Sequence, residues 1–333
     1  MNSSAFVQQL IKHKVILPPL SGYTDYPYRK ILAKFHPPFI ITEMVSAQAI
    51  IHKNQKTMQI LKIAQGTHYN GIQLFGSDPK IMSQAATIVE SLGFDYIDIN
   101  MGCTIKKVVD KGAGISLMKR EEHACLITAA VVNSVNIPIT CKLRLGVTKQ
   151  NLNGISISKK LMDAGAAAIT IHGRTGEKKF GLPIDFDSIK AIVEHLSIPV
   201  IANGGIFTGI DAKMMIKKTG AAAVMPGRGL IGNPWLIPEI SSIFSDSTFT
   251  HPTLKNKKEI CLEHLDNLCD FYGEHSGILK IRKILPEYFP RCHNLRNLKI
   301  GVQQASAHQD IIEMLDDIHE VDDRIVYDRA TSS

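Results

Sequence analysis

The sequence predicts a (β/α)8 barrel, an α/β fold with parallel strands, followed by a small all-α domain. Through the first 230 residues, short segments rich in β-branched residues alternate with amphipathic helical patterns, which is typical of parallel βαβ units. Eight such units in about 230 residues favour a closed barrel over an open doubly wound sheet. From about residue 255 onward only helical periodicity remains.

The expected strands follow one another at regular intervals. They cover residues 14–20, 39–45, 70–75, 95–101, 138–144, 167–172, 199–203 and 222–226. Helices are expected at 78–92, 121–135, 155–164, 186–196 and 209–219, and the first begins with a capping side chain and a proline, Ser77-Asp78-Pro79. The polar stretch 241–257 has the composition of a linker, so we expect one domain at 1–244 and another at 245–333.

The composition is that of a globular chain. With 44% hydrophobic and 21% charged residues among 333, the sequence has ample material for a core, which excludes a disordered or fibrous protein. No apolar run approaches the ~20 residues that span a bilayer, and no signal-peptide pattern opens the chain, so we expect a cytoplasmic protein. Six scattered cysteines without CxxC pairs argue against disulfides and against a metal site. No exposed apolar stripe stands out, so a monomer is expected.

Charge is unevenly distributed along the chain. Residues 1–244 hold 27 basic and 16 acidic side chains (27 − 16 = +11), whereas residues 245–333 hold 11 and 15 (11 − 15 = −4). The C-terminal region nevertheless contains a strongly basic segment, with Lys280, Arg282, Lys283, Arg291, Arg296 and Lys299. A basic chain with a basic helical cluster suits a polyanion such as nucleic acid, although a solvated helix face would have the same charges.

Polar residues cluster where the expected strands end, which is where the active site of such a barrel lies. They are Ser21, Gly22, Glu43, Gln73, Asn100, Cys103, Lys142, Arg144, His172, Arg174, Asn203 and Arg228. Cys103 follows a strand on a loop that carries Lys106, Lys107 and Lys111, so its thiol is placed to act as an acid or nucleophile. An ordinary loop cysteine is the alternative interpretation.

Two strands each carry a pair of basic side chains that share one face. Lys142 and Arg144 form the first pair, and His172 and Arg174 form the second. Because buried cations are costly without a counter-charge, these pairs indicate an electron-rich or anionic ligand.

Glycine-rich loops end the seventh and eighth strands, at Asn203-Gly204-Gly205 and Gly227-Arg228-Gly229, where barrels of this class bind phosphate. The spacing Gly227-x-Gly229-x-x-Gly232 also fits a dinucleotide motif, but it follows the last strand and is a weak signal. A phosphate site, a lysine and the amides of Gln73 and Asn100 together describe a site for flavin mononucleotide (FMN).

Nine motifs in order resemble those of the flavin-dependent tRNA-dihydrouridine synthase family, most closely its bacterial B-type enzymes. The resemblance is collinear over residues 15–240 and extends more loosely to Arg282-Lys283. The motifs are Pro19-Leu-Ser-Gly-Tyr-Thr-Asp25, Glu43-Met44, Gln73-Leu-Phe-Gly76, Asp98-Ile-Asn-Met-Gly-Cys103 with Lys107-Val108, Lys142-Leu-Arg144, His172-Gly-Arg-Thr175, Asn203-Gly-Gly-Ile206, Gly227-Arg-Gly229 and Gly232-Asn-Pro-Trp235.

The resemblance implies a two-step reduction of uridine in tRNA. NADPH or NADH would reduce FMN, FMN would deliver hydride to C6 of the uracil, and Cys103 would protonate C5 as general acid. The residues implied for FMN binding are Leu20, Ser21, Gly22, Gln73, Lys142, His172, Asn203, Gly204, Gly205, Gly227 and Arg228. Those implied for the substrate are Asn100, Arg144, Arg174, Lys280, Arg282 and Lys283, the last three in a helical tRNA-binding domain.

Three positions depart from the family pattern. Thr104 replaces the usual proline after the cysteine, Gly205 replaces an aspartate, and Gly176 replaces an arginine. Two alternatives therefore stay open: an FMN-dependent reductase or dehydrogenase of a free pyrimidine, and a divergent paralogue that binds RNA with little or no activity.

Overall fold

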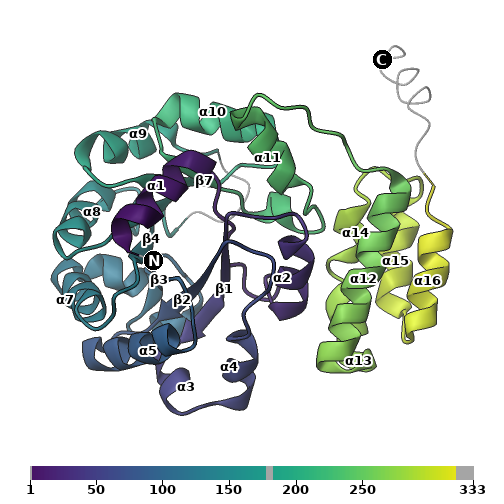
Figure 1. Cartoon of the computed structure of the whole chain (residues 1–333), viewed down its shortest axis with the longest axis horizontal. Helices are drawn as coiled ribbons and strands as arrows, with labels where there is room; N and C mark the ends of the chain where they lie inside the picture. Colours follow the sequence, from purple (N-terminus) through teal and green to yellow (C-terminus); the bar gives the residue numbers. More distant parts are fainter. Residues whose placement is uncertain (1, 178–182, 320–333) are drawn as a thin grey trace. The chain divides into compact units, whose positions relative to one another are not determined.

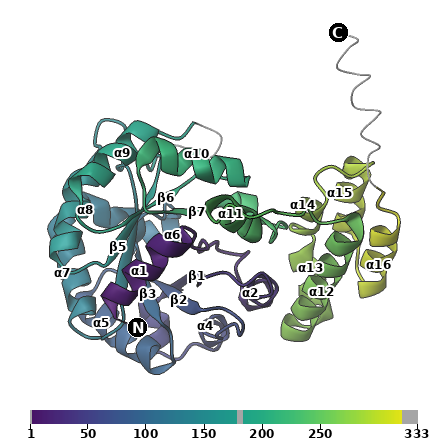
Figure 2. The ribbon, with the colours of Figure 1, turned by 45° about the horizontal axis from the view of Figure 1, so that its top comes forward.

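A computed structural model describes residues 2–177 and 183–319 of the chain, and its centre is one parallel sheet. The seven strands are neighbours in chain order: β1 (Phe39–Ser46), β2 (Tyr69–Phe75), β3 (Tyr96–Asn100), β4 (Ile139–Arg144), β5 (Ala168–His172), β6 (Val200–Asn203) and β7 (Ala223–Met225). Figures 1 and 2 show this sheet inside a ring of helices. The predicted barrel is confirmed.

The expected first strand at 14–20 is wrong in extent, because only a single parallel bridge forms there, between Val15 and Val224. The backbone N–H of Ile16 donates to Val224 (3.0 Å), and that of Leu17 donates to Phe39 at the start of β1 (3.1 Å). This short segment therefore links β7 to β1 and closes the ring. Pro18 and Pro19 follow directly, and because proline has no N–H the ladder cannot continue.

Helices and short turns follow the strands, and the longer helices cover the outside of the ring (Figure 2). In chain order they are α2 (Tyr26–Ala33), α3 (Ala47–Ile51), α4 (Gln55–Ile60), α5 (Pro79–Ser91), α6 (Lys106–Val109), the 3-10 turn η1 (Gly114–Lys119), α7 (Glu121–Val132), α8 (Gly154–Asp163), α9 (Phe186–His195), α10 (Gly209–Thr219), the turn η2 (Arg228–Leu230) and α11 (Leu236–Phe244). The predicted start of α5 is confirmed, since the Asp78 side chain accepts a hydrogen bond from the Ile81 N–H (3.0 Å).

An N-terminal helix, α1 (Ser3–His13), seals the end of the barrel at which the strands begin. Its fully buried Phe6 packs against Phe39 and Tyr96, with ring centroids 5.1 and 5.3 Å apart. Leu10 from the same helix joins this apolar cluster. With one end closed by α1, only the carboxyl ends of the strands are left to form an open mouth.

The remaining helices form a second compact unit. They are α12 (Leu254–Tyr272), α13 (Glu274–Ile281), α14 (Leu285–Tyr288), α15 (Leu295–Gln304) and α16 (His308–Asp316). Among the described residues, the barrel unit comprises 2–177, 183–230 and 236–249, and the helical unit comprises 231–235 and 250–319. The division thus falls after Phe249, not after residue 244. Trp235 belongs to the helical unit because it packs edge-on against Tyr288, with centroids 6.3 Å apart.

None of the helices within 2–177 and 183–319 is long and apolar enough to cross a membrane.

Candidate active site

A pocket of about 320 Å³ opens at the carboxyl ends of the strands. Seven of the predicted site residues line it: Ser21, Gln73, Asn100, Cys103, Lys142, Arg144 and His172. The other lining residues are Pro19, Met44, Gly102, Thr104, Ile105 and Leu143. Side chains from the first strand segment to β5 therefore meet in one place.

Strand register explains why these side chains are neighbours. Asn100 is paired with Lys142, Arg144 with His172, and His172 with Asn203 across successive parallel strands. Residues at matching register point to the same face of a sheet, so two successive rows of polar groups, Asn100 with Lys142 and Arg144 with His172 and Asn203, lie on one face.

A chain of hydrogen bonds runs from the barrel interior to the cysteine loop. Asp98 accepts from Gln73 Nε2 (2.7 Å) and from Thr140 Oγ1 (2.6 Å). Asn100 Nδ2 then donates to Gln73 Oε1 (2.8 Å), and Asn100 Oδ1 accepts the N–H of Cys103 (3.0 Å). Because each amide is fixed by its neighbour, Asp98 sets the orientation of Gln73, Asn100 and the start of the loop.

Asp98 and Lys142 are buried groups of opposite charge with displaced pKa values. Burial raises the pKa of Asp98 to about 6, against the lowering effects of its bonds from Gln73 and Thr140 and of the Lys142 charge. Burial and the Arg144 charge lower the pKa of Lys142 to about 8, and the charge of Asp98 opposes this. Displaced pKa values in a cleft are typical of functional sites.

A second amide fixes the ammonium group. Lys142 Nζ donates to Asn203 Oδ1 (3.0 Å), while Asn203 Nδ2 donates to the carbonyl oxygen of Met225 (2.7 Å). The amide of Asn203 therefore cannot turn over without losing both bonds, and Lys142 is anchored from the β6 side of the mouth.

The thiol of Cys103 is half-buried beside these groups. Burial raises its pKa, while the backbone N–H of Ile105 and the Arg144 guanidinium act in the opposite direction. A thiol with a raised pKa remains protonated near neutral pH, so it can donate a proton but is a poor resting nucleophile.

Positive charge gathers around His172. Burial lowers the pKa of His172 to about 2, and the charges of Lys142, Arg144, Arg174 and Arg228 add to the effect. Its ring is therefore neutral, and its Nε2 accepts from Arg174 Nη1 (3.3 Å). Four cations around a neutral ring make this side of the mouth suited to an anionic ligand.

The two glycine loops lie side by side, because a Cβ on Gly229 would collide with the carbonyl oxygen of Ile206. Gly204 has φ +119°, and a Cβ there would lie 3.2 Å from the His172 ring. A Cβ on Gly227, in contrast, would meet no atom of residues 2–177 and 183–319 within 4 Å. This leaves space beside the Gly227 backbone, as a phosphate bound at this loop would need.

The remaining predicted residues lie close to these groups or in the helical unit. The N–H of Gly22 donates to the Glu43 carboxylate, and the N–H of Leu20 donates to Thr24 (2.9 Å). In the helical unit, Lys280 lies over the Tyr272 ring (4.2 Å) and Lys283 is exposed. Arg282 is half-buried and donates from Nη2 to the carbonyl oxygen of Ala305 (2.6 Å), which anchors α13 to the end of α15.

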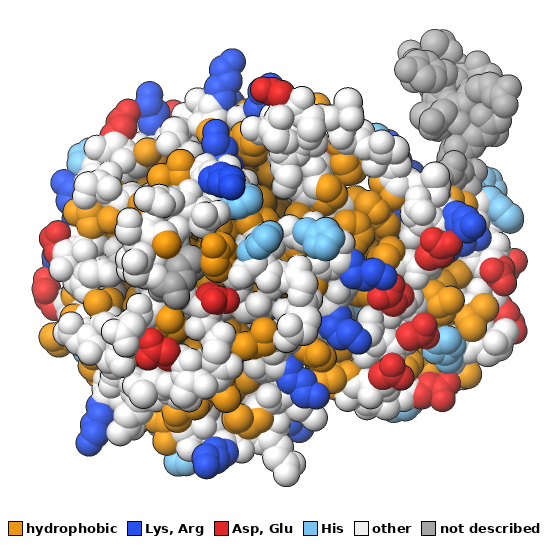
Figure 3. Space-filling view, in the orientation of Figure 1, with side chains coloured by type: hydrophobic (Ala, Val, Ile, Leu, Met, Phe, Trp, Pro, Cys, Tyr) orange, Lys and Arg blue, Asp and Glu red, His pale blue; other side chains and the backbone are white. Residues whose placement is uncertain are grey.

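Acidic side chains gather over helices α12 to α16 on the face in Figure 3, in line with the negative net charge of the C-terminal region of the sequence.

Two partners of the site are not among the residues predicted from the sequence. Asp98 shares a strand face with Asn100 but has no predicted role, and Thr140 is absent from the predicted set. Strand periodicity could have found Thr140, because it stands two residues before Lys142 and shares its face.

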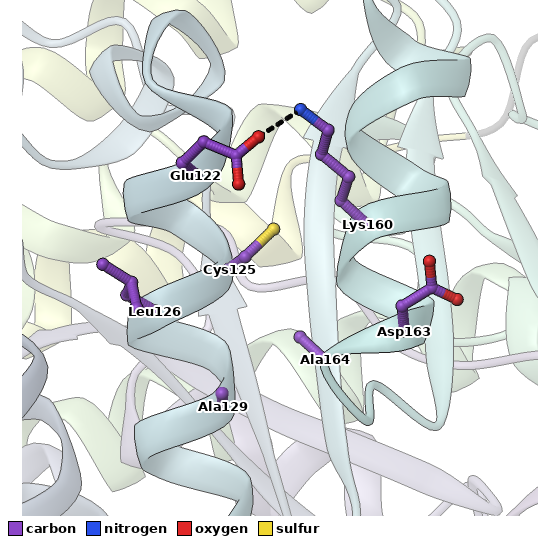
Figure 4. A pocket seen from close by; sticks show the side chains of 7 residues that line it. All are labelled: Glu122, Cys125, Leu126, Ala129, Lys160, Asp163 and Ala164. Atoms are coloured by element: carbon purple, nitrogen blue, oxygen red, sulfur yellow. Dashed lines mark hydrogen bonds and ion pairs between the residues drawn. The ribbon is translucent and has the colours of Figure 1, made fainter.

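A second pocket, of about 420 Å³, lies outside the barrel between α7 and α8 (Figure 4). Figure 4 shows Cys125 pointing between the helices and Lys160 reaching Glu122, with a separation of 2.6 Å. Lys160 also pairs with Glu121 (3.0 Å), so its charge is compensated locally. None of the predicted site residues lines this pocket, which leaves the mouth as the candidate active site.

Comparisons with the sequences of known proteins all identify the same family. A family model described as "Dihydrouridine synthase (Dus)" matches residues 16–323. The chain is similar to tRNA-dihydrouridine synthase B of Pasteurella multocida (strain Pm70), with 38% identity over 279 residues that cover 84% of each chain. It is also similar to a probable tRNA-dihydrouridine synthase of Rickettsia bellii (strain RML369-C), with 32% identity over 318 residues, 95% of this chain and 94% of the other.

Among solved structures, morphinone reductase has a similar fold. The TM-score is 0.50 at 13% sequence identity, over 73% of this chain and 88% of that one. At this identity the similarity supports the barrel fold alone.

Proposed function

This chain belongs to the dihydrouridine synthase family, and we propose that it reduces the C5–C6 double bond of uridine in tRNA, with FMN held at the barrel mouth and NADPH as reductant. The observation that carries the proposal is the meeting of the Cys103 thiol with Lys142 and the hydrogen-bonded amides of Gln73 and Asn100 in one pocket. The names of the relatives support tRNA as the substrate. Because its substrate is tRNA, we propose that the enzyme acts in the cytoplasm.

The residues of the mouth fit FMN. The space beside the Gly227 backbone, together with Gly204, Gly205 and Arg228, suits a phosphate group. Lys142 offers a positive charge and Gln73 an oriented amide for the polar edge of the ring system, and Leu20, Ser21, Gly22, His172 and Asn203 would complete the site. When bound, FMN supplies the hydride for the reduction.

Cys103 would act as the general acid that protonates C5 of the uracil. Its raised pKa keeps the proton on sulfur until it is needed, and the bond from its N–H to Asn100 holds the loop. Asn100, Arg144 and Arg174 would contact the flavin or the incoming base. A uracil must leave the RNA stack to reach the mouth. Lys280 and Lys283 of the helical unit would bind the tRNA backbone, whereas Arg282 anchors α13 to the end of α15 and would support them.

The proposal is tested by nucleoside mass spectrometry. The protein, loaded with FMN and supplied with NADPH or NADH, is incubated with tRNA that lacks dihydrouridine, and in parallel with free uridine. We expect dihydrouridine in the tRNA and no product from the free nucleoside. Reduction of free uridine at a comparable rate would instead support a reductase of small pyrimidines. FMN-loaded protein that binds tRNA but yields no dihydrouridine would contradict the proposed activity.

A further inference from the structure

Two links connect the backbone around Cys103 to the loop that follows β5, one through Arg144 and the other through Ile115. On one side, Arg144 donates from Nε to the carbonyl oxygen of Gly102 (2.8 Å) and from Nη1 to that of Thr175 (3.0 Å). Arg144 therefore connects the residue before Cys103 to the segment Thr175–Gly176. An arginine that donates to two backbone carbonyl oxygens fixes the distance between them.

On the other side the link runs through the turn η1. The N–H of Ile115 donates to the carbonyl oxygen of Cys103 (2.9 Å). The residue before it, Gly114, has φ +59°, and a Cβ at that position would lie 2.6 Å from the same carbonyl oxygen. The backbone of η1 thus lies directly against Cys103, and only glycine allows this approach.

The side chain of Ile115 completes the second link. It is 6% exposed, and its Cδ1 occupies the space that a Cβ on Gly176 would need. The carbonyl oxygen of Val147 lies 2.9 Å from the same position, so this space is bounded by backbone as well. The N–H of Gly176 donates to Gly146 (3.0 Å), which fixes the glycine itself. The size of residue 176 and the position of Ile115 are therefore coupled.

We propose that Ile115 and Gly176 are a positioning pair for Cys103: Gly176 leaves room for the Ile115 side chain, and Ile115 in turn holds the backbone of Cys103. The inference rests on the proposed function, in which Cys103 is the general acid. It gives a role to the unusual glycine at 176, because a larger residue there would displace Ile115 and with it the thiol. A displacement of about 1 Å at a reacting group can cost ~100-fold in rate.

The test uses alkylation of Cys103 by iodoacetamide, followed by peptide mass spectrometry, in protein without tRNA. We compare the native protein with Gly176→Ala, Ile115→Val and the double variant. Gly176→Ala is expected to raise the Cys103 alkylation rate several-fold, because the loop loosens and exposes a half-buried thiol. Ile115→Val in the same chain removes Cδ1 and is expected to restore part of the native rate, because the close contact of the new Cβ with the Val147 carbonyl oxygen remains. The half-buried Cys125 on α7 serves as internal reference, and Gly301→Ala, on an ordinary helical glycine of α15, is the matched control.

Turnover provides the second readout. Gly176→Ala is expected to lower kcat for tRNA about tenfold or more with little change in KM, and the double variant is expected to recover part of the lost kcat. A raised KM without a change in kcat or in alkylation would assign Gly176 to tRNA contact and overturn the proposal. An effect of Gly176→Ala that is as large in the double variant as in the single variant would also overturn the proposal.

Ile115→Ala alone keeps the inference testable if Gly176→Ala does not fold. It retains the backbone N–H but removes the buried side chain, so Cys103 alkylation is expected to rise, and an unchanged rate would contradict the pair's role. Since alkylation requires neither FMN nor tRNA, the two proposals can fail separately. Native protein that forms no dihydrouridine but shows the alkylation pattern would refute the proposed function and leave the positioning pair intact.

Discussion

At the scale of single residues, Asp98 determines how the mouth is arranged. It is 2% exposed and receives two short hydrogen bonds, so the amides above it have one orientation each. The motif around Cys103 was visible in the sequence, and so were the residues that line the pocket. The bonds among them were not, because they depend on register between strands that lie about 25 to 60 residues apart in the chain.

Asp98 also makes stability depend on pH in an unusual direction. Its pKa is raised to about 6 by burial, so between the unfolded value near 4 and about 6 the folded state binds more protons than the unfolded state. The contribution of Asp98 to the free energy of unfolding should therefore rise as pH falls from 7 to 5. Urea unfolding of the native protein and of Asp98→Asn, measured at both pH values, checks this. If the free energy of unfolding of the native protein does not rise relative to that of Asp98→Asn between pH 7 and pH 5, the burial argument is contradicted.

Lys142 predicts a second pH dependence. Since its pKa is about 8 without ligand, it is protonated at pH 7 and loses charge as pH rises above 8. Affinity for FMN, an anion, should fall from pH 7 to 9, because above pH 8 the lysine must take up a proton to bind. Flavin fluorescence titrations at several pH values measure the affinity for FMN, with Lys142→Met as control. We expect weaker and pH-independent binding in this variant over the same range. An equally steep fall in Lys142→Met would show that the lysine is not responsible.

At the scale of elements, different parts of the chain form the two ends of the barrel. The mouth is built from strand ends that the alternating pattern predicted, whereas the closed end depends on α1 and on one bridge at Val15. The first strand was predicted too long because its apolar pattern continues through Pro18 and Pro19, which cannot donate to a neighbouring strand.

The role of α1 gives a stability prediction. Phe6→Ala removes a fully buried ring that contacts Phe39 and Tyr96, and such changes cost ~3–5 kcal/mol. Ile11→Ala on the same helix changes a side chain that is 49% exposed, so we expect a change below ~0.5 kcal/mol. Urea denaturation compares the two variants. Equal effects would mean that α1 does not seal the barrel as described.

At the scale of the whole molecule, the chain combines a barrel of net positive sequence charge with a helical unit of net negative charge. The fold class and the residues that line the mouth pocket could be predicted because periodicity and strand-end residues are local in sequence. The division between the units could not be predicted to the residue. Residues 231–235 precede α11 in the chain but pack with the helical unit through Trp235, and only the folded structure reveals that contact.

The proposed role of the helical unit predicts a salt-dependent effect. Replacing Lys280 and Lys283 together by alanine should weaken tRNA binding and reduce the slope of log K against log salt by up to ~2, one for each phosphate contact. Lys255→Ala at the start of α12, where Lys255 faces Glu259 (3.9 Å), is the control. Filter binding at several salt concentrations measures the tRNA affinity and its salt slope for the double variant and for the control. A slope that stays at the native value in the double variant would remove these two lysines from the tRNA interface.

The most direct test of the central claim is the single-turnover formation of dihydrouridine by Cys103→Ala. Reduced, FMN-loaded protein is mixed with excess tRNA, and product is followed by nucleoside mass spectrometry beside Cys125→Ala, which changes a half-buried cysteine outside the mouth. If Cys103 is the general acid, its variant binds tRNA with native affinity and forms product at least ~100-fold more slowly, while Cys125→Ala keeps the native rate. Native product formation by Cys103→Ala would contradict the account.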